Sequence, residues 1–229
     1  MFQITLFLIR TTCKHDYKRT MQKNLKIRPN FDQHDEIKKP EEVKELVMKF
    51  GESTQIFQGI GQFFINLEKL WIINSQIEVV SRSDFADLKQ LKDLVLSENP
   101  IKFSTEDVFW DLEAMDRLDM NRCELKTLPE NLFKNLKKLR DLDVGSNELM
   151  RLPKNLFADN LQLEAVNLIG NKLQKIEVDF TKFPNIKQIE LRFNVCINEV
   201  FLTEKPEDST ISTTQELQAK INRSCIKNV

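Results

Sequence analysis

The side chains that could do chemistry are few, and their spacing matches no common reaction site. They are two histidines and four cysteines: His15, His34, Cys13, Cys123, Cys196 and Cys225. No Cys or His pair has metal-ligand spacing, so we expect no metal and no cofactor. Both histidines lie in an irregular N-terminal region, which leaves a nucleophile without a base. GxSxG, P-loop and GxGxxG motifs are all missing, and we expect no enzyme.

Composition narrows the class of partner. Lys and Arg total 34 against 35 for Asp and Glu, a net charge of -1, which gives no bulk attraction to nucleic acid or anionic membranes. Hydrophobic residues make up 41% of the chain, with Gly 5 and Pro 7, so the chain should fold. No apolar run approaches the roughly 18 residues of a membrane span. We therefore expect neither nucleic acid as a partner nor a membrane span.

An LxxLxLxxN/CxL pattern recurs along the chain. Its leading residues are Val43, Leu67, Leu91, Met115, Leu139, Leu163 and Ile186, each 24 after the last until a final step of 23. A second apolar column follows the same period at Phe85, Phe109, Phe133, Phe157 and Phe180. The chain is therefore predicted to contain about seven similar coils.

One such unit cannot build a core alone. Positions 4 and 6 alternate with period two, so a short strand directs both inward, whereas positions 3, 5 and 7 face outward. Stacked units give a parallel sheet on one side and turns on the other. An asparagine at position 9 offers hydrogen bonds to the turn backbone, and this position holds Asn99, Asn147, Asn171 and Asn194. In the fourth coil position 9 is Cys123. It is either a buried structural thiol, which we favour, or a reactive thiol.

These features resemble the typical 24-residue class of leucine-rich repeat found in extracellular proteins, including LPxxLF segments at 128–133 and 152–157. The resemblance covers about residues 43–196. It implies an α/β solenoid, the leucine-rich repeat horseshoe, with a curved parallel β-sheet on the concave face. Turns and short helical segments form the convex face, and a helix caps the C-terminus. The segments GIGQFF at 59–64 and NVCIN at 194–198 are similar to secreted leucine-rich repeat proteins of insects.

The chain divides into four predicted parts. Residues 1–22 are an N-terminal tail or a degenerate signal segment, because the apolar stretch 2–9 is short and lacks a preceding basic residue. A frayed tail or a misplaced start explains that stretch equally well. Residues 23–42 are the N-terminal cap, with 24–27 as an edge strand, and 43–194 hold the repeats. The C-terminal cap is 195–229.

The C-terminal cap is predicted to contain a short helix. Thr213 and Glu216 have capping-box spacing, and Leu217 and Ile221 share one apolar face.

The family resemblance also bears on the redox compartment. It implies a disulfide between Cys196 and Cys225, whose closure of about 29 residues contributes roughly 3 to 4 kcal/mol in the chain-entropy model. Two free cytosolic thiols are the alternative. Asn222 begins an N-x-S sequon and would be glycosylated only in a secreted chain. Family N-terminal caps usually pair two cysteines, but only Cys13 precedes the repeats, so its pairing stays open.

The repeat register also predicts which residues occupy the concave face. Its N-terminal half is apolar, with Val47, Trp71, Ile73 and Val95, and its middle is acidic, with Asp93, Asp119, Asp141 and Asp143. Trp71 is either an interface anchor or covered by residues 23–42. The aspartates either keep the sheet hydrated or complement a basic protein surface.

The resulting hypothesis is a non-catalytic protein-binding scaffold, secreted for recognition, that binds another protein on its concave sheet. An intracellular scaffold or regulatory subunit in the cytoplasm is one alternative, and a fragment of a receptor or adhesion ectodomain is another. Partner, pathway and oligomeric state are left open, because a fold does not choose its ligand.

Overall fold

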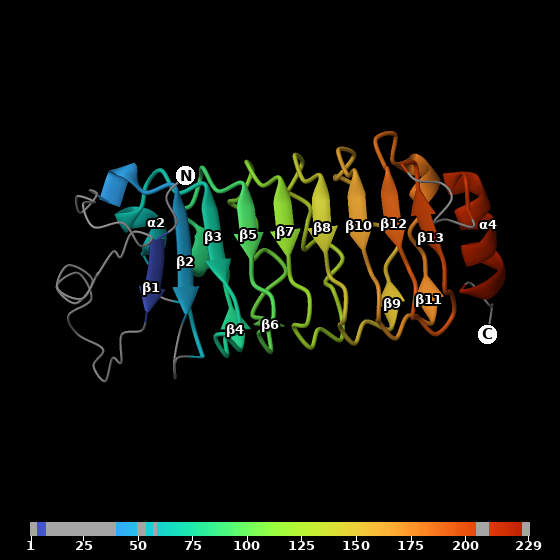
Figure 1. Ribbon diagram of the computed structural model, residues 1–229, viewed down its shortest axis with the longest axis horizontal. Helices are drawn as coiled ribbons and strands as arrows, with labels where there is room; N and C mark the ends of the chain where they lie inside the picture. The colour runs from blue at the N-terminus through green and yellow to red at the C-terminus, as the bar shows by residue number, and fades with distance from the viewer. Residues whose placement is uncertain (1–3, 8–39, 50–53, 57–58, 205–210, 226–229) are drawn as a thin grey trace.

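Seven short parallel strands, one from each repeat, stack side by side in sequence order (Figure 1). The structure is a computed structural model, and it describes residues 4–7, 40–49, 54–56, 59–204 and 211–225. The repeat strands are β2 (Glu45–Lys49), β3 (Lys69–Ile72), β5 (Asp93–Val95), β7 (Arg117–Asp119), β8 (Asp141–Asp143), β10 (Ala165–Asn167) and β12 (Gln188–Glu190). Each begins two residues after a predicted leading residue, which confirms the repeat and the fold class.

The register between strands follows the repeat period. Leu94 pairs with Leu118, Leu118 with Leu142, and Leu142 with Val166, so position 4 of each coil faces position 4 of the next. These four side chains are 0 to 1% exposed. The inward direction predicted for position 4 is confirmed, and position 6 is buried in the same way, as at Val144 and Leu168.

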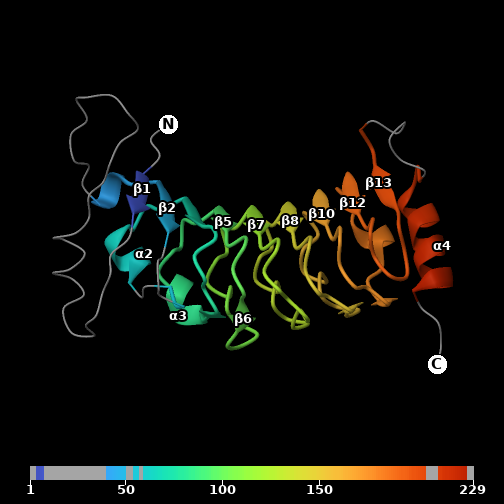
Figure 2. The ribbon, with the colours of Figure 1, turned by 60° about the horizontal axis from the view of Figure 1, so that its bottom comes forward.

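The opposite wall of the solenoid is built from turns and short segments (Figure 2). It contains the helices α2 (Ile60–Phe63), α3 (Arg82–Phe85) and η2 (Phe180–Lys182), and the two-residue strands β4 (Val79–Val80), β6 (Lys102–Phe103), β9 (Arg151–Leu152) and β11 (Lys175–Ile176). The short helix η1 (Pro40–Glu42) comes just before β2 in the chain. The predicted phenylalanine column lies beneath this wall and is buried throughout. Ring centroids of Phe85 and Phe109 are 5.7 Å apart, and those of Phe133 and Phe157 are 5.8 Å apart.

The asparagines at position 9 connect neighbouring coils. Asn147 Oδ1 accepts hydrogen bonds from the backbone N–H groups of Cys123 and Leu125 in the preceding coil, at 2.9 and 3.0 Å. Its Nδ2 donates to the carbonyls of Met120 and Val144, both at 2.9 Å. Asn99, Asn171 and Asn194 repeat this pattern. Each amide satisfies buried backbone groups that have no sheet partner, and the predicted role is confirmed.

Cys123 takes part in the same ladder as a thiol. Its side chain is fully buried, and Sγ donates to the carbonyl of Leu96 at 3.2 Å. Burial raises the pKa of the Cys123 thiol to about 12. Because the thiolate is the reactive form, the structure supports the structural reading of this residue.

In the coils from β3 to β12, the turn out of the strand has a left-handed backbone just before position 9. The residues that adopt it are Asn74, Glu98, Arg122, Ser146, Gly170 and Phe193, with φ between 48° and 65°. Glycine adopts such angles freely, whereas bulky side chains rarely do. At Glu98, Arg122 and Phe193 the tertiary register therefore imposes this conformation on residues whose own preferences oppose it.

At the C-terminal end the helix α4 (Thr214–Ser224) covers the last coil. Thr213 Oγ1 accepts from the N–H of Glu216 at 3.1 Å, as a helix N-cap does. In a capping box the Glu216 carboxylate would accept from the backbone N–H of Thr213. Here it accepts from the N–H and Oγ of Ser212, one residue earlier. Leu217 and Ile221 are both fully buried, so the predicted helix and its apolar face are confirmed.

Two further contacts hold the C-terminal cap. Strand β13 (Val200–Leu202) pairs antiparallel with β12 and closes that edge of the sheet. Cys196 and Cys225 form a disulfide, with their Cα atoms 5.2 Å apart, which joins the end of α4 to the last coil. The pairing implied by the family resemblance is present in the structure.

The N-terminal edge of the sheet carries an additional strand. Strand β1 (Ile4–Phe7) runs parallel to β2, with Ile4 paired to Leu46. It belongs to the apolar stretch that the sequence analysis assigned to a tail or signal segment. The edge strand predicted at 24–27, and Cys13, lie outside the described residues, so the boundaries at 22 and 42 stay predictions.

Replacing Leu142 by alanine tests the register of the stack. The side chain is fully buried in β8, and its loss should lower the free energy of unfolding by roughly 2 to 5 kcal/mol. Urea unfolding followed by circular dichroism measures the change. Leu161→Ala is the matched control, because Leu161 is 49% exposed, and it should cost less than about 0.5 kcal/mol. Equal effects of the two substitutions would contradict the register.

Candidate functional site

The concave face consists of the outward side chains of adjacent parallel strands. All eight residues predicted to bind protein lie on it, from β2 to β8, with Ile73 directly after β3. Six are partly exposed: Val47, Trp71, Ile73, Asp93, Asp141 and Asp143. Val95 and Asp119 are buried, at 5% and 7% exposure. The structure brings the predicted set together, and two of its members contribute little surface.

The apolar half of this face is centred on Trp71. In the sheet register Trp71 lies between Val47 on β2 and Val95 on β5. Its side chain is partly exposed, but the indole Nε1 is buried and has no hydrogen-bond partner among the residues that the structure describes. Whether residues 23–39 cover this patch lies outside the described residues.

Arg117 lies at the centre of the acidic half. Its guanidinium nitrogens are 3.8 Å from Asp93, 3.4 Å from Asp119 and 3.5 Å from Asp141. One cation therefore faces three carboxylates. Arg117 occupies position 3 of its coil, which the repeat predicts to face outward. Its shared role follows from the strand register, which puts Asp93 and Asp141 on either side of it.

Asp119 and Asp143 are directly paired across β7 and β8. Asp119 accepts hydrogen bonds from the backbone N–H and the side-chain amide of Asn121. Asp143 accepts from the N–H of Gly145 and from Asn167 Nδ2. Like charges that face one another across strands are destabilising, and hydrogen bonds offset this cost without cancelling the charge.

Burial and neighbouring negative charges both raise the pKa values of Asp119 and Asp141. Burial raises the pKa of the Asp119 carboxyl, and the nearby Asp143 charge raises it further. The pKa of Asp141 is also raised by burial, against the lowering effect of Arg117. For Asp119 and Asp141, the hydrogen bonds and Arg117 therefore do not fully offset the effects that raise the pKa.

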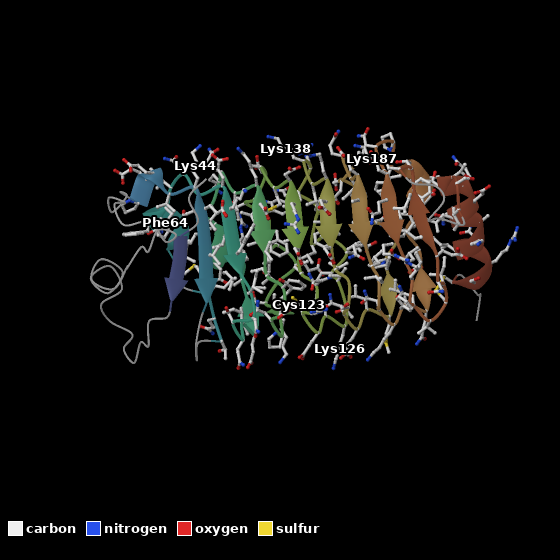
Figure 3. The ribbon with its side chains drawn as sticks, in the orientation of Figure 1. Lys44, Phe64, Cys123, Lys126, Lys138 and Lys187 are labelled. Carbon is white, nitrogen blue, oxygen red and sulfur yellow. A yellow bond between two sulfur atoms is a disulfide. The ribbon has the colours of Figure 1, made fainter. Side chains whose placement is uncertain are left out.

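The charges along the edge where the strands begin are arranged differently. Position 2 of successive coils alternates in sign: Lys44, Glu68, Lys92, Asp116, Arg140, Glu164 and Lys187. Glu68 accepts from Lys44 and Lys92 at 2.7 and 2.8 Å, and these bonds lower its pKa to about 2. Figure 3 shows Lys44 and Lys187 at opposite ends of this edge.

The remaining members of this edge row are paired in the same manner. Arg140 forms a two-pronged contact with Asp116 and lies 3.9 Å from Glu164, which also pairs with Lys187 at 2.7 Å. The alternating row was not among the predicted features, although the 24-residue spacing of these charges contains the signal. The charges of this edge are thus paired within the chain, whereas the concave centre holds one arginine among three carboxylates.

Neither a metal site nor a membrane helix emerges from the described ranges. No group of three or more His, Cys, Asp or Glu side chains there is arranged to hold a metal ion. No helix among these residues is long and apolar enough to cross a membrane.

The leucine rich repeat family model matches residues 65–125 and 137–195, more than half of the chain. The chain belongs to the leucine-rich repeat family. No curated protein is similar enough in sequence to match it.

Solved structures of other leucine-rich repeat proteins share the fold. The APL1 leucine-rich repeat domain has a TM-score of 0.62 and 24% identity, over 67% of this chain and 40% of that one. Human 5T4, a trophoblast glycoprotein, has a TM-score of 0.57 and 21% identity, over 67% of this chain and 61% of that one. The TLR13 chain of the TLR13–ssRNA13 complex has a TM-score of 0.53 and 21% identity, over 66% of this chain and 25% of that one. This leucine-rich repeat chain thus covers less than two thirds of each of them.

Substitution of Asp119 by asparagine tests the uncompensated charge. Because the folded pKa of Asp119 is raised, its ionised form opposes folding above that pKa, and the penalty disappears as the pH falls through it. Asp119→Asn should therefore raise the free energy of unfolding at pH 7 by roughly 0.2 to 1 kcal/mol, the scale of a cross-strand pair. Denaturant titrations from pH 7 to pH 3 should show this gain shrinking. A loss of stability at pH 7 would mean that the Asn121 hydrogen bonds outweigh the charge.

Proposed function

We propose that this leucine-rich repeat chain is a non-catalytic scaffold that binds another protein through its concave sheet. The observation that carries the proposal is the pairing of a partly exposed tryptophan with an acidic group on one continuous face. Trp71, Val47 and Ile73 offer apolar area, and aromatic anchors dominate the energetics of many interfaces. The stacked strands hold these side chains on a rigid surface, which suits recognition.

A protein is a better partner for this face than a nucleic acid. The acidic centre has one guanidinium among several carboxylates, and such a surface repels phosphate backbones. A partner with Lys or Arg side chains would complete the charge balance and speed association.

We further propose that the protein is secreted and acts in extracellular recognition. The support is the Cys196–Cys225 disulfide in the C-terminal cap, since disulfides persist in oxidising compartments and are rare in the cytosol. Asn222 is exposed on α4, so glycosylation of its sequon would be compatible with this location.

Replacing Trp71 by alanine is expected to weaken partner binding while the chain stays folded. The variant would lose the contact area of the indole ring. A hot-spot residue contributes about 2 kcal/mol to the binding free energy, so affinity should fall tenfold or more. Binding is measured by surface plasmon resonance and folding by circular dichroism. Trp110→Ala serves as control, because Trp110 is 39% exposed and lies outside the concave strands. If the Trp71 variant unfolds instead, this residue belongs to the core.

Expression in a secreting eukaryotic cell tests the location. Intact mass spectrometry of the medium, with and without reduction, should reveal a secreted chain that gains 2 Da on reduction of one bridge. Peptide mapping should place the bridge between Cys196 and Cys225, and glycosidase treatment should report on Asn222. A chain that stays in the cell with both thiols free would favour the intracellular scaffold.

A further inference from the structure

The two most exposed large hydrophobic side chains of the described residues are two positions apart, at the C-terminal end of the stack. Phe193 is 71% exposed and Val195 is 67% exposed. They flank Asn194 of the asparagine ladder, at the edge toward which the arrowheads of the repeat strands point in Figure 1. Large apolar groups that are exposed together often mark interaction sites. This edge is therefore a candidate contact surface separate from the concave face.

Phe193 is held in its exposed position in an unfavourable backbone conformation. Its φ is 57°, a left-handed angle that bulky residues rarely adopt. Its N–H donates to Asn198 Oδ1 at 2.7 Å, and Cys196, three residues later, is joined to α4 by the disulfide. The preceding coil has Gly170 at this place, which adopts the angle freely. A strained residue that the fold holds exposed to solvent is a candidate for function.

The residues beside Phe193 form a regular row along this edge. Position 8 of the fourth to the seventh coil holds Arg122, Ser146, Gly170 and Phe193. The N–H groups of the first three donate to the carbonyl of position 7 in the next coil, at 3.1, 2.6 and 2.9 Å. The coils therefore keep the strand spacing of about 4.8 Å here. The row has an arginine at one end, small residues in the middle and the phenylalanine at the other end.

The charges at position 10 of the same coils restrict how a second copy could pack on this edge. Glu148 in the fifth coil and Lys172 in the sixth form an ion pair at 3.0 Å, and their side chains are 40% and 54% exposed. A two-fold axis across the edge, midway between these coils, reverses the coil order and sets Glu148 of each copy opposite Lys172 of the other. An axis through either coil would set like charges against each other, which is unfavourable. Charge complementarity thus selects the axis between the two coils.

The same axis brings the two ends of the row together. The fourth and seventh coils lie equally far from it, at about 7 Å on either side, so Phe193 of one copy faces Arg122 of the other. Arg122 is 66% exposed, and its guanidinium lies 3.2 Å from Glu98. A planar guanidinium stacks well on an aromatic ring. At the centre, Ser146 faces Gly170, and their small size allows the two backbones to approach closely.

We propose that this edge is a homodimer contact, in which two copies pack edge to edge in antiparallel order. Phe193 of each copy stacks on Arg122 of the other, and Lys172 of each pairs with Glu148 of the other. Four coils span only about 19 Å, so the contact is small and the association is weak and concentration-dependent. None of the eight concave residues takes part, and the inference does not rest on the proposed function.

Sedimentation velocity of the full chain over a wide range of micromolar concentrations tests the dimer. The sedimentation coefficient should rise from that of a monomer to that of a dimer as the concentration increases. Phe193→Ser should raise the dimer Kd at least about tenfold. Ile65→Ser is the matched control, because Ile65 is 57% exposed and lies outside the fourth to the seventh coil, and it should leave Kd unchanged. A monomer at every concentration, or a dimer that Phe193→Ser does not weaken, would overturn the proposal.

Charge reversal tests the register of the contact. Lys172→Glu and Glu148→Lys each set like charges against each other across the axis, so each variant alone should stay monomeric where the unmodified chain dimerises. An equimolar mixture of the two variants should dimerise again, because every charge then faces its opposite. Both variants lose the ion pair within the chain, and mixing cannot repair that loss, so recovery reports on the contact between copies. A dimer formed by either variant alone, or no dimer in the mixture, would refute this arrangement.

Discussion

The structure depends on the fit of each coil to the next, because no coil can bury its own leucines. A coil of 24 residues offers a short strand and a turn, and its apolar side chains are covered only when neighbours stack in register. The asparagine ladder enforces that register. Asn147 holds backbone groups of its own coil and of the coil before it, so a shift of one residue would leave several buried groups unpaired. Stability is thereby shared along the array, and the outward side chains are left available for function.

Those outward side chains divide into two classes by their electrostatics. Along the edge where the strands begin, alternate signs neutralise one another from Lys44 to Lys187. Exposed pairs of this kind contribute little individually, but a row of them discourages slippage and needs no external charge. On the concave centre, Asp119 and Asp143 face one another beside a single arginine. The fold therefore balances the charges of one row and leaves those of the other row less balanced, and this difference supports the proposed binding surface.

The two ends of the stack are built differently. At the C-terminus, β13 pairs with the last repeat strand and α4 covers its core with Leu217 and Ile221, while the disulfide fixes the helix end. At the N-terminus, β1 adds a parallel strand from a stretch whose composition also fits a signal segment. An apolar stretch has the same composition in either role, so its composition alone does not distinguish them.

Sequence alone determined the repeat, the strand positions, the phenylalanine column and the asparagine ladder, because a strict period leaves one way to align equal units. It also placed all eight candidate residues on one face, since alternation along a strand fixes direction. It did not determine which of them are accessible: Val95 and Asp119 are buried by their neighbours, and burial depends on contacts from other coils. Nor did it show the shared role of Arg117, the unpaired atoms of Trp71 and Asp93, or the left-handed turn at Phe193. Those features arise between coils, and distances between coils are set by packing in three dimensions.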